Sequence, residues 1–125
     1  MKKILVIEDE FNQFESLFNY VNDIYMENEL SFTNVVKSQD LNPFSSLSAY
    51  YMVFVDIKLG NKSELDGYGI LKKIETDNIP VKKIVIFTGN NKIMEMLKAR
   101  GVTGEYEIVT KPVELSRLRE LFQSV

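Results

Sequence analysis

The sequence predicts an α/β protein with a parallel sheet covered by helices on both faces, a doubly wound arrangement. Three observations lead to this fold class. Short, continuous apolar runs rich in β-branched residues are typical of strands buried on both faces. Segments with apolar residues at helical spacing separate these runs. Strand and helix patterns alternate five times along 125 residues, a length that suits a single domain over residues 1–125.

Five apolar runs are expected to form the strands. Three of them are continuous and strongly apolar. The second run is more mixed and suits an edge strand, and the last is only two residues long. In chain order the runs cover residues 4–7, 30–36, 52–57, 84–87 and 108–109.

Four helices are expected from apolar stripes, and a shorter one from a capping pattern. The short helix is expected within residues 40–49, with Asp40 as its cap and Pro43 in its first turn. The four stripes consist of Phe11, Phe14, Leu17, Phe18 and Val21; Ile70, Leu71 and Ile74; Ile93, Met94, Met96 and Leu97; and Leu115, Leu118, Leu121 and Phe122.

The composition narrows the chemistry that the chain can perform. It has no cysteine and no histidine, which excludes disulfides, Ser-His and Cys-His catalysis, and the usual zinc sites. Any bound metal must use oxygen ligands, as Mg²⁺, Mn²⁺ and Ca²⁺ do. The net charge of −3 does not indicate the basic surface that binds nucleic acid, so direct binding of nucleic acid is not expected. No apolar run is long enough to cross a bilayer, so we expect no membrane partner and a cytoplasmic location.

Polar residues follow the apolar runs at the points where the strands should end. Glu8 and Asp9 follow the first run, and Asp56 lies near the carboxyl end of the third. Thr88 follows the fourth run and Lys111 the fifth. In open α/β sheets the site lies at the carboxyl ends of the strands, so these five residues are expected to converge.

This set of side chains has a chemical logic. Three clustered carboxylates raise one another's pKa, and a divalent cation such as Mg²⁺ relieves their repulsion. A carboxylate beside Mg²⁺ and Lys111 can act as a nucleophile toward phosphorus and form an acyl phosphate. Thr88 would donate a hydrogen bond to the transferring phosphoryl group, while the cations neutralise its charge.

Each of these residues also has an ordinary interpretation when taken alone. The acids after the first run could simply begin a helix, where the helix dipole favours them, and we prefer that interpretation for Glu10. Asp56 could form a structural salt bridge. Thr88 and Lys111, each in isolation, are better explained as a strand-end hydroxyl and a solvated lysine. The specific signal is the occurrence of the set at successive strand ends.

The set Glu8-Asp9, Asp56, Thr88 and Lys111-Pro112 resembles, in order and spacing, the receiver domain of bacterial two-component response regulators. The resemblance implies a flavodoxin-like, CheY-like (βα)5 fold with strand order 2-1-3-4-5. It makes Asp56 the phosphoacceptor, with Thr88 and Lys111 as its catalytic partners. It also implies a cis bond before Pro112.

The same resemblance implies a metal site for Mg²⁺, with Mn²⁺ as a substitute. Asp9 and Asp56 would bind the metal directly, together with the backbone carbonyl of Lys58. Glu8 would act mainly through a bound water.

The chain departs from the family's usual pattern in three places. Gly60 replaces a usual proline and the Asp-Gly pair comes about three residues late, so residues 60–65 are expected to form an inserted, exposed loop that could alter partner access. Ile108 stands where the family has an aromatic residue, and Tyr106 lies two residues earlier. Lys58 stands two residues after Asp56, where its long side chain could cover the phosphoryl group, so we expect a long-lived phosphorylated state.

The leading hypothesis is therefore a phosphorylatable signalling switch that assists its own phosphorylation and dephosphorylation and is not otherwise an enzyme. The expected partners are a sensor histidine kinase or histidine phosphotransfer protein, and a downstream effector protein or an output domain outside this sequence. The readout surface, and a homodimer if one forms, would use residues 90–125.

Two alternatives stay open at this point. One is a phosphorylation-independent protein-binding module on the same fold, which the isoleucine at position 108 keeps open. The other is a phosphatase of the haloacid dehalogenase type, although that class places a second Asp where Lys58 stands.

Overall fold

Five parallel strands form one sheet in the order β2-β1-β3-β4-β5. The computed structural model describes residues 1–124. All five predicted strands are present, and the mixed run at residues 30–36 lies at an edge as expected. The predicted fold class is confirmed. The strands are β1 (Lys2–Ile7), β2 (Leu30–Val35), β3 (Met52–Asp56), β4 (Ile84–Thr88) and β5 (Glu107–Thr110).

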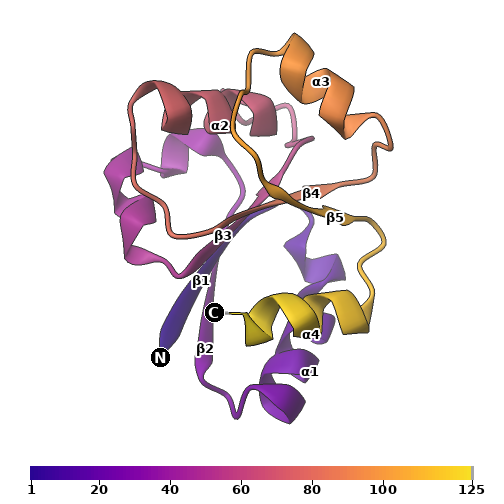
Figure 1. Cartoon of the computed structure of the whole chain (residues 1–125). Helices are drawn as coiled ribbons and strands as arrows, with labels where there is room; N and C mark the ends of the chain where they lie inside the picture. Colours follow the sequence, from indigo (N-terminus) through magenta and orange to yellow (C-terminus); the bar gives the residue numbers. More distant parts are fainter. Residues whose placement is uncertain (125) are drawn as a thin grey trace.

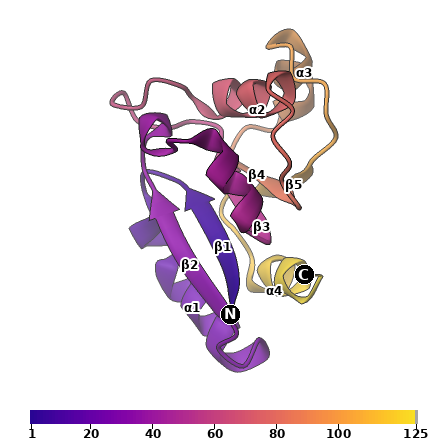
Figure 2. The same cartoon turned by 90° about the vertical axis from the view of Figure 1, so that its left-hand side faces the viewer.

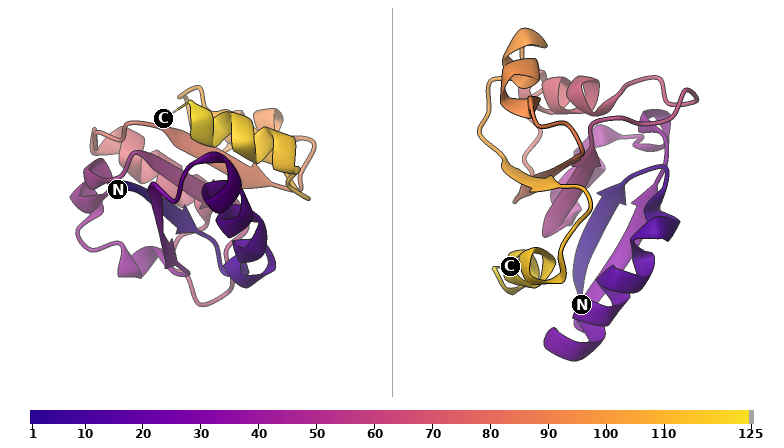
Figure 3. Two further views of the ribbon diagram at one scale, coloured as in Figure 1. Left: turned by 90° about the horizontal axis from the view of Figure 1, so that it is seen from below. Right: turned by 90° about the vertical axis from the view of Figure 1, so that its right-hand side faces the viewer.

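Helices cover both faces of this sheet. On one face lie α1 and α4, and on the other lie α2 and α3 with the 3₁₀ helix η3 (Figure 1, Figure 3). No helix in the described part of the chain combines the length and apolar character needed to span a membrane. The α-helices are α1 (Glu15–Tyr25), α2 (Gly67–Thr76), α3 (Ile93–Ala99) and α4 (Leu115–Gln123); the 3₁₀ helices are η1 (Phe11–Gln13), η2 (Ser38–Asp40) and η3 (Phe44–Ala49).

The connection between β2 and β3 differs from the single capped helix predicted over residues 40–49. It consists of two 3₁₀ helices, η2 and η3, which Figure 2 shows beside the sheet edge. Asp40 ends the first instead of capping a helix, and Pro43 precedes the second with extended backbone, φ −82° and ψ 154°. A proline disfavours helical backbone at the residue before it, so Pro43 opposes a continuous helix through residues 42 and 43.

The core has two layers because successive residues of each strand point to opposite faces. In β1, Ile4 and Val6 pack toward α1 and α4, whereas Leu5 and Ile7 pack toward α2 and α3. Since both sets are buried, the strand reads as a continuous apolar run.

The apolar stripe predicted for α3 is only half buried. Ile93 and Leu97 face the core, whereas Met94 is 61% and Met96 38% exposed. Ile93 and Leu97 lie four residues apart on one face of this seven-residue helix, which is the face that packs against the core.

Candidate functional site

Three carboxylates meet at the carboxyl edge of the sheet, as the strand-end rule predicts. Glu8, Asp9 and Asp56 each place one oxygen within 4.8 Å of the others. Lys111 and Thr88 reach the same place from the ends of the neighbouring strands, β5 and β4. The structure therefore brings all five predicted strand-end residues together.

Glu8 is fully buried, and both oxygens of its carboxylate are hydrogen-bonded. Oε1 accepts a hydrogen bond from the Glu10 N–H at 3.1 Å, and Oε2 accepts one from Lys111 Nζ at 2.9 Å. Burial, together with the charge of Asp56, raises the pKa of Glu8 to about 7 despite the opposing contact with Lys111. The surroundings of Glu8 therefore disfavour its charged form, even though it is paired with Lys111.

The end of β1 is held in place by a side chain from the edge strand. Asn34 of β2 donates hydrogen bonds from Nδ2 to the carbonyl oxygens of Val6 and Glu8, both at 2.9 Å. These contacts fix the backbone that presents Glu8 and Asp9 to the site.

Asp9 lies in a different environment from its neighbour. Its side chain is exposed, and it pairs with no basic side chain within residues 1–124. Gly60 approaches it closely, because a Cβ atom at position 60 would lie 3.1 Å from Asp9 Oδ2.

Asp56 ends β3 and is 3% exposed. Its Oδ1 accepts hydrogen bonds from Lys111 Nζ at 3.2 Å and from the Lys58 N–H at 3.3 Å. Behind it, a Cβ atom at Gly67 would lie only 2.4 Å from the Asp56 carbonyl oxygen, so only glycine fits there. Asp66 caps the helix that begins at this glycine by accepting a hydrogen bond from the Gly69 N–H at 2.8 Å.

The Lys111 ammonium group is shared between Glu8 and Asp56 and lies against two aromatic rings. Its Nζ is 5.4 Å from the centre of Phe14 and 5.3 Å from that of Phe87. Burial alone would lower the pKa of Lys111, but the two carboxylates outweigh it and raise the pKa above its usual value. The lysine is therefore held charged and aimed at Asp56. The Lys111–Pro112 bond is cis, as expected.

Thr88 is buried at the end of β4 with its hydroxyl oxygen accepting a hydrogen bond from the Asn90 N–H at 3.0 Å. Its hydroxyl hydrogen remains available for another acceptor. The Thr88 carbonyl accepts a hydrogen bond from the Lys111 N–H at 2.8 Å, which ties the ends of β4 and β5 together.

Asp9, Asp56, Thr88 and Lys111 line a cleft of about 990 Å³, and the fully buried Glu8 is not part of its lining. Its donor set suits a hard divalent cation, because three carboxylates face one ammonium group and Asp9 lacks a basic partner in the described chain. Besides Asp9, Asp56, Thr88 and Lys111, the lining includes Glu10, Lys58, Gly60, Asn61, Asp66, Tyr68, Asn90 and Met96. The side chain of Lys58 is exposed at its rim.

Ile108 occupies the position of the expected aromatic residue, and Tyr106 supplies an aromatic ring nearby. Ile108 and Tyr106 both pack on the face of the sheet that carries α2 and α3, as residues two apart in a strand direction should. The Tyr106 hydroxyl donates a hydrogen bond to the Glu75 carboxylate of α2. The Tyr106 ring therefore packs against the core, and its hydroxyl is hydrogen-bonded to α2.

Several residues that shape the site were not predicted from the sequence. Phe14 was assigned to the core alone, and Asn34 and Gly60 were given no role in positioning carboxylates. An amide side chain in a mixed edge strand is a weak signal for such a role, and a glycine in a loop expected to be inserted is another. Neither identifies its partner without the tertiary structure.

Comparisons with known proteins agree with this geometry. The family model described as the response regulator receiver domain matches residues 4–123. No curated protein is detectably similar in sequence. Solved structures share the fold at low identity, among them a two-component response regulator from Clostridium difficile at 23% identity and TM-score 0.72, with 99% of this chain and 94% of that one covered.

Two further structures show the same likeness. The signal receiver domain of a putative Luxo repressor protein from Vibrio parahaemolyticus is 21% identical with a TM-score of 0.71, covering 98% of this chain and 88% of that one. The chemotaxis protein CheY4 of Vibrio cholerae is 15% identical with a TM-score of 0.67, covering 100% and 98%.

Proposed function

Because the chain belongs to the family of response regulator receiver domains, we propose that it is a phosphoacceptor switch in which Asp56 is the phosphorylated residue. Members of this family are regulatory signalling domains. The observation that carries the proposal is the position of Asp56: a nearly buried carboxylate lines an open cleft and is 3.2 Å from a lysine ammonium group.

The transfer would proceed by attack of an Asp56 carboxylate oxygen on phosphorus. The bond between phosphorus and the imidazole nitrogen of a donor histidine breaks, the imidazole leaves with its electron pair, and an acyl phosphate remains on Asp56. The donor is a histidine kinase or a histidine phosphotransfer protein.

The other site residues have roles that follow from their contacts. Lys111 Nζ already contacts Glu8 and Asp56. Its positive charge would also stabilise the phosphoryl oxygens during transfer. Thr88 can donate its hydroxyl hydrogen to the phosphoryl group while the Asn90 N–H holds its oxygen.

Mg²⁺, or Mn²⁺ in its place, fits the carboxylate set described above. Asp9, Asp56 and the backbone carbonyl of Lys58 would hold it, with Glu8 acting through a water. When bound, the metal supplies positive charge that stabilises the phosphoryl oxygens during transfer.

Phosphorylation would shift the population between two conformations of the region that follows Thr88. The proposed readout surface spans residues 90–125 and passes the signal to an effector protein or an output domain. Val125, the last residue of that range, lies outside the described residues.

The decisive experiment is incubation of the protein with Mg²⁺ and acetyl phosphate, followed by measurement of intact mass. We expect one phosphoryl adduct on the wild type and on the exposed-site control Asp40→Asn, and none on Asp56→Asn. An adduct that survives in Asp56→Asn would refute the assignment of the phosphoacceptor.

A second candidate is a phosphorylation-independent binding module, favoured by Ile108 at the position of the usual aromatic residue. It predicts no adduct with any donor. A phosphatase would instead show steady turnover of phosphate esters.

The lifetime of the phosphorylated state tests the role of Lys58 separately. Its exposed side chain lies at the rim of the cleft, where it can shield the acyl phosphate from water. The acyl phosphate on the Lys58→Ala variant should hydrolyse faster than that on the wild type. Lys62 lies in the neighbouring loop, and Lys62→Ala should leave the rate unchanged. An unchanged half-life of the Lys58→Ala adduct would count against shielding.

A further inference from the structure

Residues 60–65, the segment that lengthens the loop after Asp56, are fastened to the short helix η2. The Ser38 N–H donates a hydrogen bond to Ser63 Oγ at 2.9 Å, and the Leu65 N–H donates one to Ser38 Oγ at 2.9 Å. The Ser63 hydroxyl in turn donates to the Leu65 carbonyl at 2.6 Å. Ser38 is 2% exposed, so this contact is shielded from water.

Gln39 adds two more contacts to the same segment. Its Nε2 donates a hydrogen bond to the Lys62 carbonyl at 2.7 Å, and its Oε1 accepts one from the Glu64 N–H at 3.0 Å. The segment therefore uses backbone atoms and the Ser63 hydroxyl, and the side chains of Lys62 and Glu64 take no part in these contacts. Its path is fixed by η2.

The fastened segment is connected to the carboxylate cluster. The Ser63 N–H donates a hydrogen bond to the Gly60 carbonyl at 3.1 Å. Gly60 lies against Asp9, where an added Cβ atom would come 3.1 Å from Oδ2, closer than an ordinary van der Waals contact. Hydrogen bonds thus connect Ser38 through Ser63 to Gly60, whose open Cβ position faces the Asp9 carboxylate.

We propose that η2 is a positioning element for Asp9: Ser38 and Gln39 hold the backbone of Gly60 as a wall against its carboxylate. This inference rests on the proposed function, in which Asp9 is a metal ligand. Asp9 is exposed and has no basic partner in the described chain, so its rotamers are otherwise weakly restrained. The wall removes some of these rotamers before a metal binds.

The inference distinguishes two roles of the inserted loop. A loop that only covers surface would tolerate any change that leaves the protein folded. A loop that positions Asp9 should change metal affinity when its backbone is released or when Gly60 gains a side chain. Gly60 has no positive φ, so alanine at this position adds bulk toward Asp9 without backbone strain.

The test is a titration with Mn²⁺, followed by the electron paramagnetic resonance signal of free Mn²⁺, on the full chain and its variants. Gly60→Ala should weaken Mn²⁺ binding by about tenfold, the lower end of the range for residues that orient metal ligands. Gln39→Ala and the double variant Ser38→Ala/Ser63→Ala should also weaken it, by no more than Gly60→Ala does. Thermal unfolding without metal checks that each variant is folded.

Matched controls lie within the same segment. Lys62→Ala and Glu64→Ala remove side chains that make none of the fastening contacts, and should leave Mn²⁺ affinity unchanged. Ser63→Thr keeps the hydroxyl and should bind Mn²⁺ like the wild type. In the acetyl phosphate reaction, the Mg²⁺ concentration for half-maximal rate should rise in Gly60→Ala, while the rate at saturating Mg²⁺ stays the same.

Wild-type affinity in folded Gly60→Ala and Gln39→Ala would overturn the inference and leave the proposed function standing. Failure of the wild type to bind Mn²⁺ would overturn both. If Ser63→Thr lowered Mn²⁺ affinity as much as the double variant does, this would also count against the inference. The hydroxyl at position 63 would then make no difference to metal binding.

Discussion

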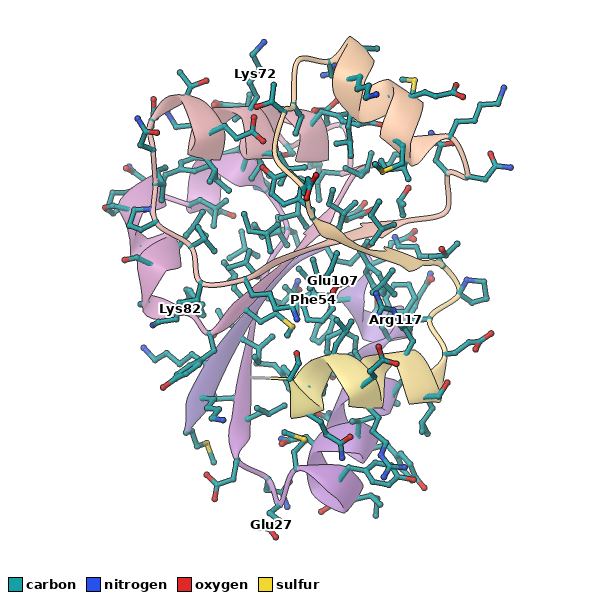
Figure 4. All side chains as sticks on the ribbon, in the orientation of Figure 1. Glu27, Phe54, Lys72, Lys82, Glu107 and Arg117 are labelled. Carbon is teal, nitrogen blue, oxygen red and sulfur yellow. The ribbon has the colours of Figure 1, made fainter. Side chains whose placement is uncertain are left out.

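The face of the sheet covered by α1 and α4 is held by interlocking phenylalanine rings, whereas the face covered by α2 and α3 is fastened at its rim by polar contacts. Seven of the eight phenylalanines lie on the first face. Phe18 alone has four rings within 5.2–5.6 Å of its own: Phe11, Phe32, Phe54 and Phe122. Figure 4 shows Phe54 near the centre of the molecule.

On the second face, Tyr106 and Tyr68 make polar contacts at the rim and do not join a cluster of rings. Tyr106 donates its hydroxyl hydrogen to Glu75, which also accepts hydrogen bonds from Thr103 and from the Gly104 N–H. Tyr68 of α2 lies under Arg100, 4.7 Å from ring centre to guanidinium, and Arg100 pairs with Asp66 at 3.1 Å. Arg100 directly follows α3, and Asp66 directly precedes α2.

From this difference we expect the ring cluster of the first face to be stiffer than the polar rim of the second. Close-packed rings resist rearrangement, because any displacement opens voids in the core. Polar contacts at a rim can exchange with water one at a time at small cost. The two sides meet at the candidate site, where the rings of Phe14 and Phe87 support Lys111 and the Asn90 N–H holds Thr88. The proposed switch therefore has its adjustable side next to Thr88.

The largest effect should come from breaking the ring cluster. Phe18→Ala should lower the free energy of unfolding by about 3–5 kcal/mol, because it removes a fully buried ring and leaves a cavity. Urea denaturation measures it. The matched change on the other face, Phe44→Ala, removes a half-buried ring and should cost clearly less. Equal costs would contradict the distinction between the two faces.

The polar rim should give a middle-sized effect. Glu75→Ala should lower the free energy of unfolding by about 1–2 kcal/mol, because the Tyr106 hydroxyl and the backbone at residues 103 and 104 lose their shared acceptor. Glu75→Gln, which keeps one acceptor oxygen, should cost less. Hydrogen exchange should quicken at residues 103–106 and stay unchanged in α1. Uniform quickening across the chain would show that the rim is not a separate unit.

Comparison of these regions also shows what sequence patterns can supply. The strands were predictable because burial on both faces produces continuous apolar runs, as at residues 4–7. The convergence of Glu8, Asp9, Asp56, Thr88 and Lys111 was predictable because parallel strands end at one edge of a sheet. Both follow from local patterns and one topological rule.

The remaining features depend on contacts between distant segments. Nothing near Gln39 indicates that its amide holds the backbone of residues 62 and 64, and nothing near Tyr106 indicates Glu75 as a partner. The helix expected at residues 40–49 failed for a local reason, since the constraint imposed by Pro43 on its predecessor outweighed the cap signal at Asp40.

The pH dependence of stability should isolate the contact between Glu75 and Tyr106. Burial alone would raise the pKa of Glu75, but hydrogen bonds from Thr103, Tyr106 and Gly104 bring it below its usual value of 4.5. Burial and the bond to Glu75 raise the pKa of Tyr106 above its usual value of 10.0. The folded state therefore binds protons less tightly at Glu75 and more tightly at Tyr106 than the unfolded chain does.

The stabilisation should accordingly be present between about pH 4.5 and pH 10, and be lost as the pH falls below or rises above that window. Thermal unfolding midpoints of the wild type and Tyr106→Phe, measured from pH 3 to 11, should differ most within the window, and the difference should narrow below pH 4.5 and above pH 10. A constant difference across the whole range would show that the ionisations are not linked to folding.

The smallest effect should come from the ion pair between Arg100, which follows α3, and Asp66, which precedes α2. Arg117 and Glu107 form a comparable pair at 2.8 Å between α4 and β5, and both residues are labelled in Figure 4. Arg100→Ala should lower the free energy of unfolding by no more than about 1 kcal/mol, because the Arg100–Asp66 pair lies at the surface in contact with solvent.

Arg100→Lys keeps the charge but loses the planar stacking on Tyr68, so it separates the two contributions. Added salt should weaken the ion-pair contribution and leave the stacking contribution unchanged. A cost above about 2 kcal/mol would exceed what an exposed pair supplies and would make this rim as stiff as the ring cluster. A small loss of stability means that little free energy holds α3 against α2. A helix that follows Thr88 requires this if it is to shift when Asp56 is phosphorylated.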